Sequence, residues 1–418
     1  MLDKIKQVTS NHKVLIQNFS YLSALQVFNM LVPLITYPYL IRVLGKETYG
    51  LVVYAQAIVG YLVILIDFGF NISATKEISI HRNNKEKLEE VVSSVFIIKG
   101  ALFFISVIIL ISLTFIIPQA KEYKTLFLLT LWMCLYNVIF PIWYFQGIEQ
   151  MKYITYITLV SRLSFLGLIF IFIKSQNDYL FIPILNGVGA LIAGIAALYI
   201  IFIKHYINFR IPKKAVLNKY FKDSLIIFTS RISSLKDNTP TFLIGTFLGN
   251  SEVAYYDLVY KVIRVLISVF DNITNVFFPR VAKSKDHNLN RRIVKFELVF
   301  IVIAYTLLCI FAKQIVLIIG GEQMLPSIPI FYILGLLLLR PLSSFIGATV
   351  LVTNNLTKEF SKNLIYATIV YFLITLLLFP LKIVSVYTFA MTIVLALFFE
   401  IGHRLYIIRK NQLKHWIL

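Results

Sequence analysis

The chain alternates between long apolar runs and short polar segments over its whole length. Twelve runs have about the 20 residues that an α-helix needs to cross the hydrocarbon core of a bilayer. The pattern therefore predicts an all-α integral membrane protein with about twelve transmembrane helices. The predicted spans are 15–41, 49–73, 91–117, 125–147, 153–173, 179–203, 223–248, 253–279, 296–319, 326–352, 363–380 and 383–406.

The cations between the spans indicate the orientation of the chain. Of the 40 Lys and Arg residues, 26 lie at the termini or in the even-numbered loops when Arg404, near the end of the last span, is counted with the C-terminus, and 6 lie in the opposite loops. Because cytoplasmic loops are enriched in Lys and Arg, both termini are predicted to be cytoplasmic. The longest internal loop is basic, so we predict lobes at 1–204 and 223–418 joined by a linker at 205–222. Binding of this loop to anionic lipid explains its charge equally well.

The two predicted lobes resemble each other when the first is shifted by 204 residues. Leu44-Gly45 then falls on Leu248-Gly249, and Asp67 falls on Asp271. Six spans in each lobe give both lobes the same orientation, which is typical of transporters built from parallel repeats. Prolines at matching places in the first and seventh spans predict interrupted helices there, although bends that serve only packing remain an alternative.

The predicted span 253–279 carries four charged residues on one helix face, namely Asp257, Lys261, Arg264 and Asp271. Residues three, four and seven positions apart share a face of an α-helix. A charge at mid-membrane costs about 2.5–3.5 kcal/mol on insertion scales, so such residues usually face a bundle interior or a wet cavity. We predict that Lys261 and Arg264 line a path for an anion. The alternative is a buried network that pairs Asp257 with Lys261 and Arg264 with Asp271.

Three further intramembrane cations are candidates for the same cationic cavity: Arg231, Arg340 and Arg162. Lys236 and Asp237 are adjacent, and mutual neutralisation is one interpretation of this pair. Lys99 lies near a span end and is expected to extend to the cytoplasmic surface. It is therefore not counted as a site residue.

Three carboxylates are candidates for ion coupling: Asp67, Asp271 and Asp257. Burial raises the pKa of a carboxyl group, which would let Asp67 bind a coupling proton. Pairing of Asp67 with an arginine elsewhere in the chain is an equally good interpretation.

Composition narrows the class of protein further. Hydrophobic residues make up 59% of the chain, charged residues make up 14%, and the net charge is +20. Because the positive charge lies between apolar spans, it indicates membrane topology and not nucleic-acid binding. The two cysteines lie within apolar runs, and the six histidines lie outside the spans or, in the case of His403, at the end of one, so we expect no metal site, no cofactor and no catalytic residues.

Two sequence runs resemble a known family. Pro38-Tyr-Leu-Ile-Arg-Val-Leu-Gly-Lys-Glu-Thr-Tyr-Gly50 is followed by Asp67-Phe-Gly-Phe-Asn71, and Trp143-Tyr-Phe-Gln-Gly-Ile-Glu149 ends the fourth span. These runs, within about the first 155 residues, resemble the polysaccharide-transporter family. That family includes the Wzx-type O-antigen and capsule flippases of the MOP (multidrug/oligosaccharidyl-lipid/polysaccharide) superfamily.

The resemblance implies a MOP/MATE-like fold of two six-helix lobes. It implies a flippase that moves undecaprenyl-pyrophosphate-linked oligosaccharide from the cytoplasmic to the external leaflet by alternating access, with cation coupling left open. The expected location is the bacterial cytoplasmic (inner) membrane. Expected partners are the lipid-linked oligosaccharide, membrane lipids and polysaccharide polymerase or assembly proteins, without nucleic acid.

Three other functions are alternatives to the flippase. A multidrug or cation antiporter of the same superfamily is the main alternative, but it is expected to have an acidic residue in the first span, where this chain has none. A membrane glycan polymerase would need a large external loop, and the predicted external loops are short. A scaffold without transport activity is compatible with the sequence alone.

Overall fold

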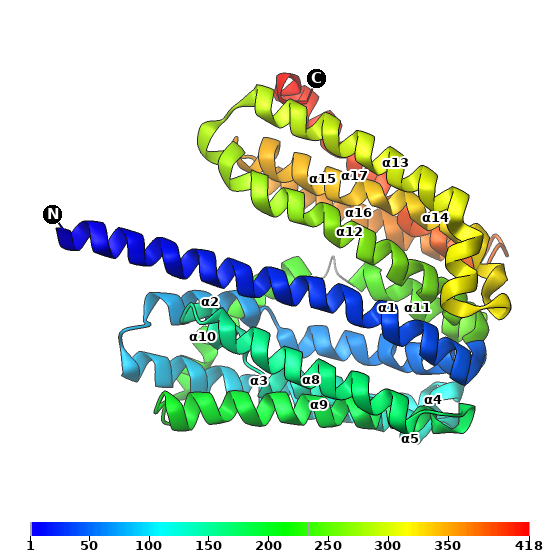
Figure 1. The fold of residues 1–418 in the computed structure, drawn as a ribbon, viewed down its shortest axis with the longest axis horizontal. Coiled ribbons are helices and arrows are strands. Elements are labelled where there is room, and N and C mark those ends of the chain that lie inside the picture. The colour runs from blue at the N-terminus through cyan, green and yellow to red at the C-terminus, as the bar shows by residue number, and fades with distance from the viewer. Residues whose placement is uncertain (1, 232–234, 418) are drawn as a thin grey trace. The chain divides into compact units, whose positions relative to one another are not determined.

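The computed structural model describes residues 2–231 and 235–417, without the side chains of residues 2–16, 19, 229–231, 273–276 and 279. All regular elements of the described ranges are helical (Figure 1). Three helices exceed 32 residues: α1 (Leu2–Asp67), α12 (Asn250–Ser284) and α13 (His287–Gly320). At about 1.5 Å per residue, each is longer than the hydrocarbon core of a bilayer is thick.

The remaining α-helices are α2 (Phe70–Ile80), α3 (Lys85–Ile116), α4 (Pro118–Glu122), α5 (Lys124–Thr130), α6 (Trp132–Ile139), α7 (Ile142–Gly147), α8 (Met151–Phe172), α9 (Phe181–Leu198), α10 (Lys214–Arg231), α11 (Leu235–Phe247), α14 (Ile328–Leu334), α15 (Leu339–Ile346), α16 (Thr357–Leu377) and α17 (Val386–Lys410). Short 3₁₀ or π segments are η1 (Gln176–Leu180), η2 (Tyr199–Lys204), η4 (Glu322–Ser327), η5 (Gly335–Leu338), η6 (Gly347–Val352) and η7 (Lys414–Trp416).

Nine segments of the described chain are long and apolar enough to span a bilayer. The first, Ser20–Ile80, contains the predicted span 49–73 and most of 15–41 in one run, and the other eight coincide with predicted spans. The predicted spans 223–248 and 253–279 correspond to α10–α11 and to α12. Neither is among the nine segments. The prediction of an all-α integral membrane protein is confirmed.

Residues 1–44 and 55–232 form one compact unit, called unit 1 here. Within it α9 packs against both α8 and α6, and α2 packs against α7. Figure 1 shows α8 and α9 side by side and antiparallel. The core of unit 1 is rich in aromatic side chains, and Trp143, Tyr144 and Phe145 are each at most 1% exposed.

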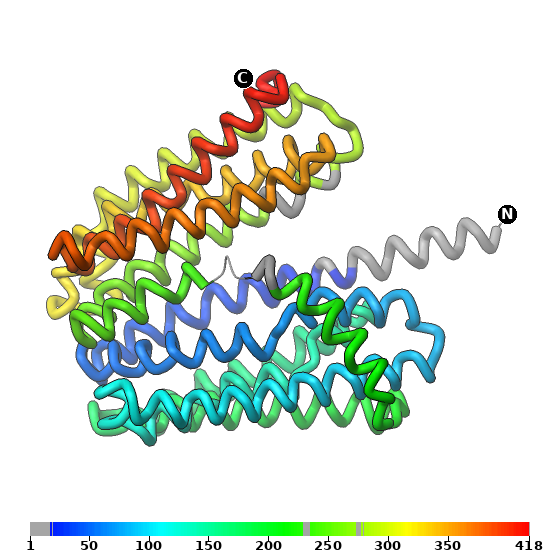
Figure 2. The backbone as a smooth tube through the Cα atoms, turned by 180° about the vertical axis from the view of Figure 1, so that it is seen from behind, coloured from blue at the N-terminus to red at the C-terminus, as the bar shows by residue number. Residues whose placement is uncertain are grey.

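Residues 45–54 and 233–418 form the second compact unit, called unit 2. Its helices α16 and α17 pack along each other, and α12 packs against α11, α14 and α15 (Figure 2). The segment Gly45–Tyr54 belongs to unit 2, although it is part of α1. A Cβ on Gly50 would lie 1.8 Å from the carbonyl oxygen of Asn250, so only glycine permits this approach of the two backbones.

The units divide at residues 232–233, later than the predicted linker at 205–222. The end of the predicted linker lies in α10, which packs against α2 and α3 within unit 1. Two backbone amides just before α10 are also fixed to α3. The Asn208 amide donates to Glu89 Oε1 at 3.0 Å, and the Arg210 amide donates to Ser93 Oγ at 2.9 Å. These bonds give residues 205–222 fixed positions in unit 1.

Two glycines at matching repeat positions share an unusual backbone conformation. Gly45 has φ 74° and ψ 164°, and Gly249 has φ 105° and ψ 173°. Each separates two helical stretches: Gly45 lies within α1, and Gly249 precedes α12. Positive φ favours glycine, and this shared geometry supports the internal repeat. The first span was predicted to be interrupted at its prolines. Pro33 and Pro38 instead lie inside α1, and the residue of α1 with non-helical dihedral angles is Gly45.

The Asp67–Asn71 motif forms the turn between α1 and α2. Phe68 and Gly69 both have positive φ, at 44° and 81°. The Phe68 ring stacks on Phe221 and Phe228 of α10, with centroids 4.8 and 4.9 Å away. A Cβ on Gly69 would lie 2.9 Å from the Ile227 side chain. The motif therefore fixes a tight turn against α10.

The Trp143–Glu149 motif fixes the contact between α7 and α2. A Cβ on Gly147 would lie 2.4 Å from the Ile78 side chain, so the glycine lets the two helices touch. Glu149 ends the motif with φ 59°, and its carboxylate pairs with Arg82 at 2.8 Å. Both motifs thus have structural roles in unit 1.

Candidate functional site

The charged stripe of α12 begins with an ion pair. Lys261 Nζ lies 2.7 Å from Asp257 Oδ2, one helical turn away. The Tyr49 hydroxyl donates to the same Asp257 oxygen at 2.6 Å, and Lys261 Nζ donates to the Tyr49 oxygen at 3.0 Å. Asp257 is only 6% exposed, so these contacts compensate a buried carboxylate. The charge of Lys261 is therefore balanced within unit 2.

Arg264 follows Lys261 by one helical turn, but its surroundings differ from those of Lys261. Its side chain is exposed, and it makes no hydrogen bond or ion pair with any described residue. Its charge acts on Asp271, two turns further along α12, but the two groups are not in contact. The sequence offered a network of two ion pairs as an alternative. The structure contains the Asp257–Lys261 pair, but Arg264 and Asp271 do not form an ion pair.

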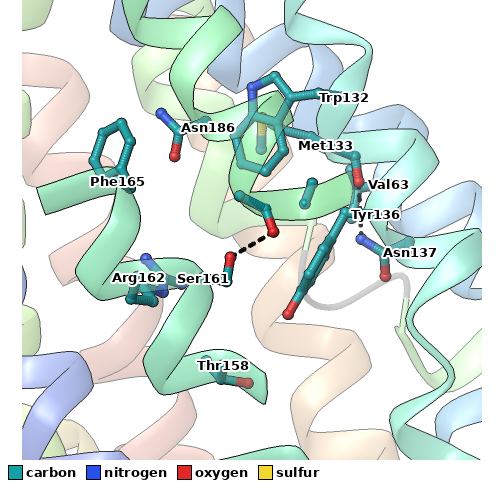
Figure 3. A pocket seen from close by; sticks show the side chains of 12 residues that line it. Val63, Trp132, Met133, Tyr136, Asn137, Thr158, Ser161, Arg162, Phe165 and Asn186 are labelled. Carbon is teal, nitrogen blue, oxygen red and sulfur yellow. Dashed lines mark hydrogen bonds between the residues drawn. The ribbon is translucent and has the colours of Figure 1, made fainter. Parts of the chain in front are cut away.

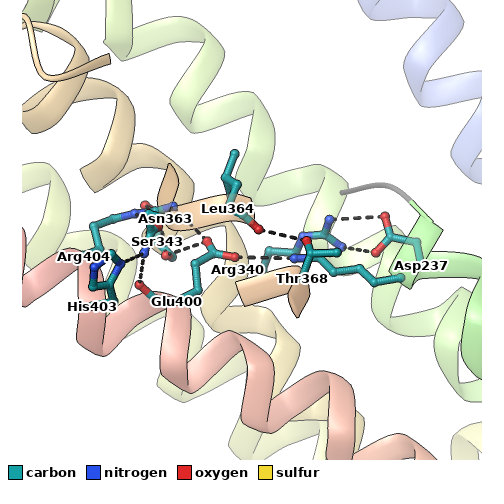
Figure 4. Close-up of polar contacts among 10 residues, drawn as sticks. Asp237, Arg340, Ser343, Asn363, Leu364, Thr368, Glu400, His403 and Arg404 are labelled. Carbon is teal, nitrogen blue, oxygen red and sulfur yellow. Dashed lines mark hydrogen bonds and ion pairs between the residues drawn. The ribbon is translucent and has the colours of Figure 1, made fainter. Parts of the chain in front are cut away.

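Arg340 of α15 is held by a carboxylate from another helix. Its two terminal nitrogens meet the two oxygens of Asp237 of α11 at 3.0 and 3.3 Å (Figure 4). This bidentate arrangement is the strongest geometry for an arginine and a carboxylate. The interpretation in which Asp237 and the adjacent Lys236 neutralise each other does not hold, because Asp237 binds Arg340 and Lys236 lies nearest to another carboxylate.

Lys236 belongs to a buried polar cluster at α17 that the sequence analysis missed. Lys236 Nζ lies 3.7 Å from Glu400 Oε2, and Arg404 Nη2 donates to Glu400 Oε1 at 2.9 Å. Asn363 accepts from Arg404 at 2.9 and 3.1 Å, and Ser343 accepts from it as well (Figure 4). Every member is at most 7% exposed. Each charge in this cluster therefore has a partner inside the protein.

Arg404, which the sequence groups with the cytoplasmic cations, is buried within the protein and not solvated, since it is 1% exposed. The available signal was the spacing of Glu400 and Arg404. An acidic and a basic residue four positions apart lie on one helix face and pair there. In an apolar helix such as α17, that spacing indicates a buried pair rather than a helix end in solvent.

Arg162 of α8 lines a pocket of about 160 Å³ within unit 1 (Figure 3). The pocket wall is rich in groups that bind polar ligands: Trp132, Tyr136, Asn137, Ser161 and Asn186. Ser161 Oγ donates to the Gly189 carbonyl at 2.7 Å, which fixes α8 against α9 at the pocket. The Arg162 side chain itself is exposed. Aromatic faces, amides and one cation are together suited to a sugar or an anionic group.

Asp67 lies near a buried cation that the sequence analysis set aside. Lys99 is 2% exposed and donates to the Asn137 carbonyl at 3.0 Å, so the expectation that it extends to the surface is wrong. The charge of Asp67 acts on Lys99. Asn137 thus holds Lys99 through its backbone while its side chain lines the Arg162 pocket.

The side chain of Arg231 lies outside the described residues. Within the described part of the chain, no group of three or more His, Cys, Asp or Glu residues is arranged to hold a metal ion.

The sequence matches the family described as "Polysaccharide biosynthesis protein" over residues 15–285, which is more than half of the chain. The chain belongs to this polysaccharide biosynthesis protein family. The matched range contains both sequence motifs, the Arg162 pocket and the charged stripe of α12. It therefore extends well beyond the first 155 residues, where the resemblance was recognised.

This polysaccharide biosynthesis protein is 29% identical over 382 residues to an Escherichia coli (strain K12) protein named "Putative O-antigen transporter", covering 90% of this chain and 91% of the relative. Among solved structures, it is similar to an inward-facing MATE family multidrug transporter of the MOP superfamily, with TM-score 0.72 and 14% identity over 92% of this chain and 95% of the other. It is equally similar to the lipid II flippase MurJ, with TM-score 0.72 and 14% identity over 93% and 87% of the two chains. The MOP/MATE-like fold is confirmed.

Proposed function

We propose that the chain is a flippase that moves undecaprenyl-pyrophosphate-linked oligosaccharide from the cytoplasmic to the external leaflet of the bacterial inner membrane. Membership of the polysaccharide biosynthesis protein family and the transporter named above support transport over catalysis. Alternating access of the two units, with both termini in the cytoplasm, completes the proposal. A polysaccharide polymerase or assembly protein would then use the product.

The observation that carries the proposal is the state of the charges in unit 2. The carboxylates Asp237, Asp257 and Glu400 are each paired with a cation. Arg264 is exposed and makes no contact with a described partner. The unit therefore offers a positive charge to a ligand, which suits pyrophosphate and opposes a cationic drug.

In this proposal Arg264 binds the pyrophosphate by charge-assisted hydrogen bonds, helped by Lys261, Arg340 and Arg231. Lys261 and Arg340 would contribute mainly through their field, because each already has a carboxylate partner. The pocket at Arg162 would receive part of the glycan. Asp67 and Asp271 are the proposed groups for ion coupling, whereas Asp257 would keep its structural pair.

The test uses a strain that lacks the gene, in which surface polysaccharide and lipid-linked repeat units are both quantified. We expect surface polysaccharide to disappear and repeat units to accumulate. Wild type should restore export, Arg264→Ala should fail, and Arg264→Lys should restore part of it. Arg409→Ala, which removes an exposed cation at the end of α17, is the matched control and should behave as wild type.

Two outcomes would contradict the proposal. If surface polysaccharide does not depend on the gene, the chain is not its flippase, and the multidrug antiporter becomes the better explanation. If Arg264→Ala exports as well as wild type at equal protein level, Arg264 does not bind the cargo.

A further inference from the structure

Unit 2 contains a second buried glutamate whose surroundings are opposite to those of Glu400. Glu297 of α13 is 0% exposed, and both of its carboxylate oxygens are buried without a hydrogen-bond partner among the described residues. Glu400 is buried to a similar degree, at 4% exposed, but it is bonded by Arg404 and Ser343 and lies beside Lys236. The two residues form a natural comparison within one unit.

A buried carboxylate needs partners to remain ionised. Transferring an isolated charge from water into a protein interior is so unfavourable that the group takes up a proton instead. Glu400 has two cations, which stabilise its ionised form. Glu297 has no hydrogen-bond or ion-pair partner in the described part of the chain, so the neutral acid is the form that this environment tolerates.

The charged groups around Glu297 strengthen this conclusion. Among the described residues, α12 presents Asp271, whose negative charge reaches Glu297. Arg264 of α12 and Arg340 of α15 act in turn on Asp271. Two ionised carboxyl groups at this place would repel each other, so the arrangement favours a shared proton.

The other elements packed against α13 bring their titratable groups to different levels of the helix. η7 carries Lys414 and His415, and His415 contacts α13 at His287 and Arg291, in its first two turns. α14 carries Tyr332, whose carbonyl accepts from Tyr305, two turns beyond Glu297. Glu322 of η4 follows the end of α13, and η5 has no titratable side chain.

We propose that Glu297 is a proton-binding site of unit 2 that carries its proton in the conformation described here. Arg264 links the site to the cargo, and this step rests on the proposed function. An anion bound to Arg264 would offset the cation that stabilises ionised Asp271. Asp271 would then take up a proton when cargo binds and release it when cargo leaves, and the Asp271–Glu297 pair would keep its protons to a higher pH while cargo is bound.

The protonation state of Glu297 is measured by infrared spectroscopy of the full-length protein reconstituted in lipid vesicles. Spectra are recorded over a series of pH values. A protonated carboxylic acid has a carbonyl absorption that vanishes when the acid ionises. We expect such a band in wild type at neutral pH and its loss at alkaline pH. The band should be missing in Glu297→Gln and unchanged in Glu400→Gln. An identical band in wild type and Glu297→Gln would overturn the proposal.

Stability provides a second readout that also needs no transport. Glutamine resembles a protonated glutamate, so Glu297→Gln should unfold at the wild-type temperature at neutral pH. Glu400→Gln should unfold at a lower temperature, because Arg404 and Lys236 lose their counter-charge. A large loss of stability in Glu297→Gln with little loss in Glu400→Gln would show that Glu297 is the ionised member.

The link to Arg264 is tested separately by adding undecaprenyl pyrophosphate to the vesicles. The titration of the Glu297 band should move to higher pH in wild type and should not move in Arg264→Gln. A titrating band without any such movement would retain the proton site and overturn its link to the cargo. The proton site and the proposed function can therefore fail independently.

Discussion

Tyr49 and Asp257 are joined by a 2.6 Å hydrogen bond, although they lie 208 positions apart in the chain. Tyr49 comes from the part of α1 that packs in unit 2, and it is 2% exposed. Its hydroxyl and Lys261 Nζ meet the same oxygen of Asp257. The beginning of the charged stripe on α12 is therefore a closed, satisfied group, which leaves the exposed cation to Arg264.

This relationship predicts the effect of two substitutions on stability. Asp257→Asn leaves Lys261 without a counter-charge and should lower the free energy of unfolding by about 3 kcal/mol, near the low end for a broken buried pair because Lys261 keeps some solvent. Tyr49→Phe removes one bond to a charged group and should cost about 1.5 kcal/mol. Thermal unfolding in detergent micelles measures both, and equal stability of Asp257→Asn and wild type would contradict the assignment.

A pair of glycine substitutions tests the backbone approach in unit 2. Gly50→Ala should prevent correct folding, because its Cβ would lie 1.8 Å from the Asn250 carbonyl oxygen. Gly402→Ala of α17 is the matched control, since no atom lies within 4 Å of its Cβ position, and it should stabilise the helix by about 0.5–1 kcal/mol. Yield of monodisperse protein on size-exclusion chromatography distinguishes the two. A well-folded Gly50→Ala protein would refute this packing.

The Arg162 pocket predicts a loss of function without a loss of fold. Arg162→Gln removes the one charged group of the pocket wall and should lower export by about tenfold, the effect of losing roughly 1.4 kcal/mol of binding. Lys152→Gln removes an exposed cation from the same helix and should leave export unchanged. Export is measured at equal protein level in the strain that lacks the gene. Equal export by the two variants would remove Arg162 from the site.

His205 predicts a pH dependence of the stability of unit 1. Its Nδ1 lies 2.9 Å from the Tyr144 hydroxyl, and burial, followed by the charges of Lys204 and Lys152, lowers the pKa of this imidazole below 6.5. The unfolded chain therefore binds a proton at a pH where the folded chain does not, so stability decreases as the pH falls below about 6.5. His205→Gln should weaken this decrease.

The measurement is the unfolding temperature of wild type and His205→Gln between about pH 5 and 8. Both proteins should show little change at the alkaline end, where the imidazole is neutral in both states. Parallel curves down to the acidic end would show that His205 does not contribute to the dependence.

The helices and the helix faces were predictable from the sequence, whereas the partners of the charges were not. Apolar length identifies a span, and a period of three to four residues places Asp257 and Lys261 on one face. The partner of Asp237 is Arg340, 103 positions away, and not the adjacent Lys236. Neighbouring residues in a helix point in different directions, so the choice depends on which helix packs there.

Burial caused the other differences between prediction and structure. Lys99 and Arg404 both lie near the ends of predicted spans, where long cations usually reach water. Lys99 is instead held by a carbonyl of α6, and Arg404 by an amide of α16 and by the carboxylate of Glu400 in its own helix. The burial of Glu297 was not predicted either. It follows the cations Arg291, Arg292 and Lys295 at the start of a predicted span, where a glutamate is expected to reach water.

The position of Gly45–Tyr54 in unit 2 has a consequence for the synthesis and folding of the nascent chain. A ribosome makes this segment some 180 residues before α11 begins. At synthesis rates of about 5–20 residues per second, the segment waits roughly 10–40 s for the helices that it will pack against. During that time the rest of unit 1 is being synthesised while one piece of unit 2 is already present, so the two halves of the gene cannot be separated at residue 232 without dividing unit 2 between them.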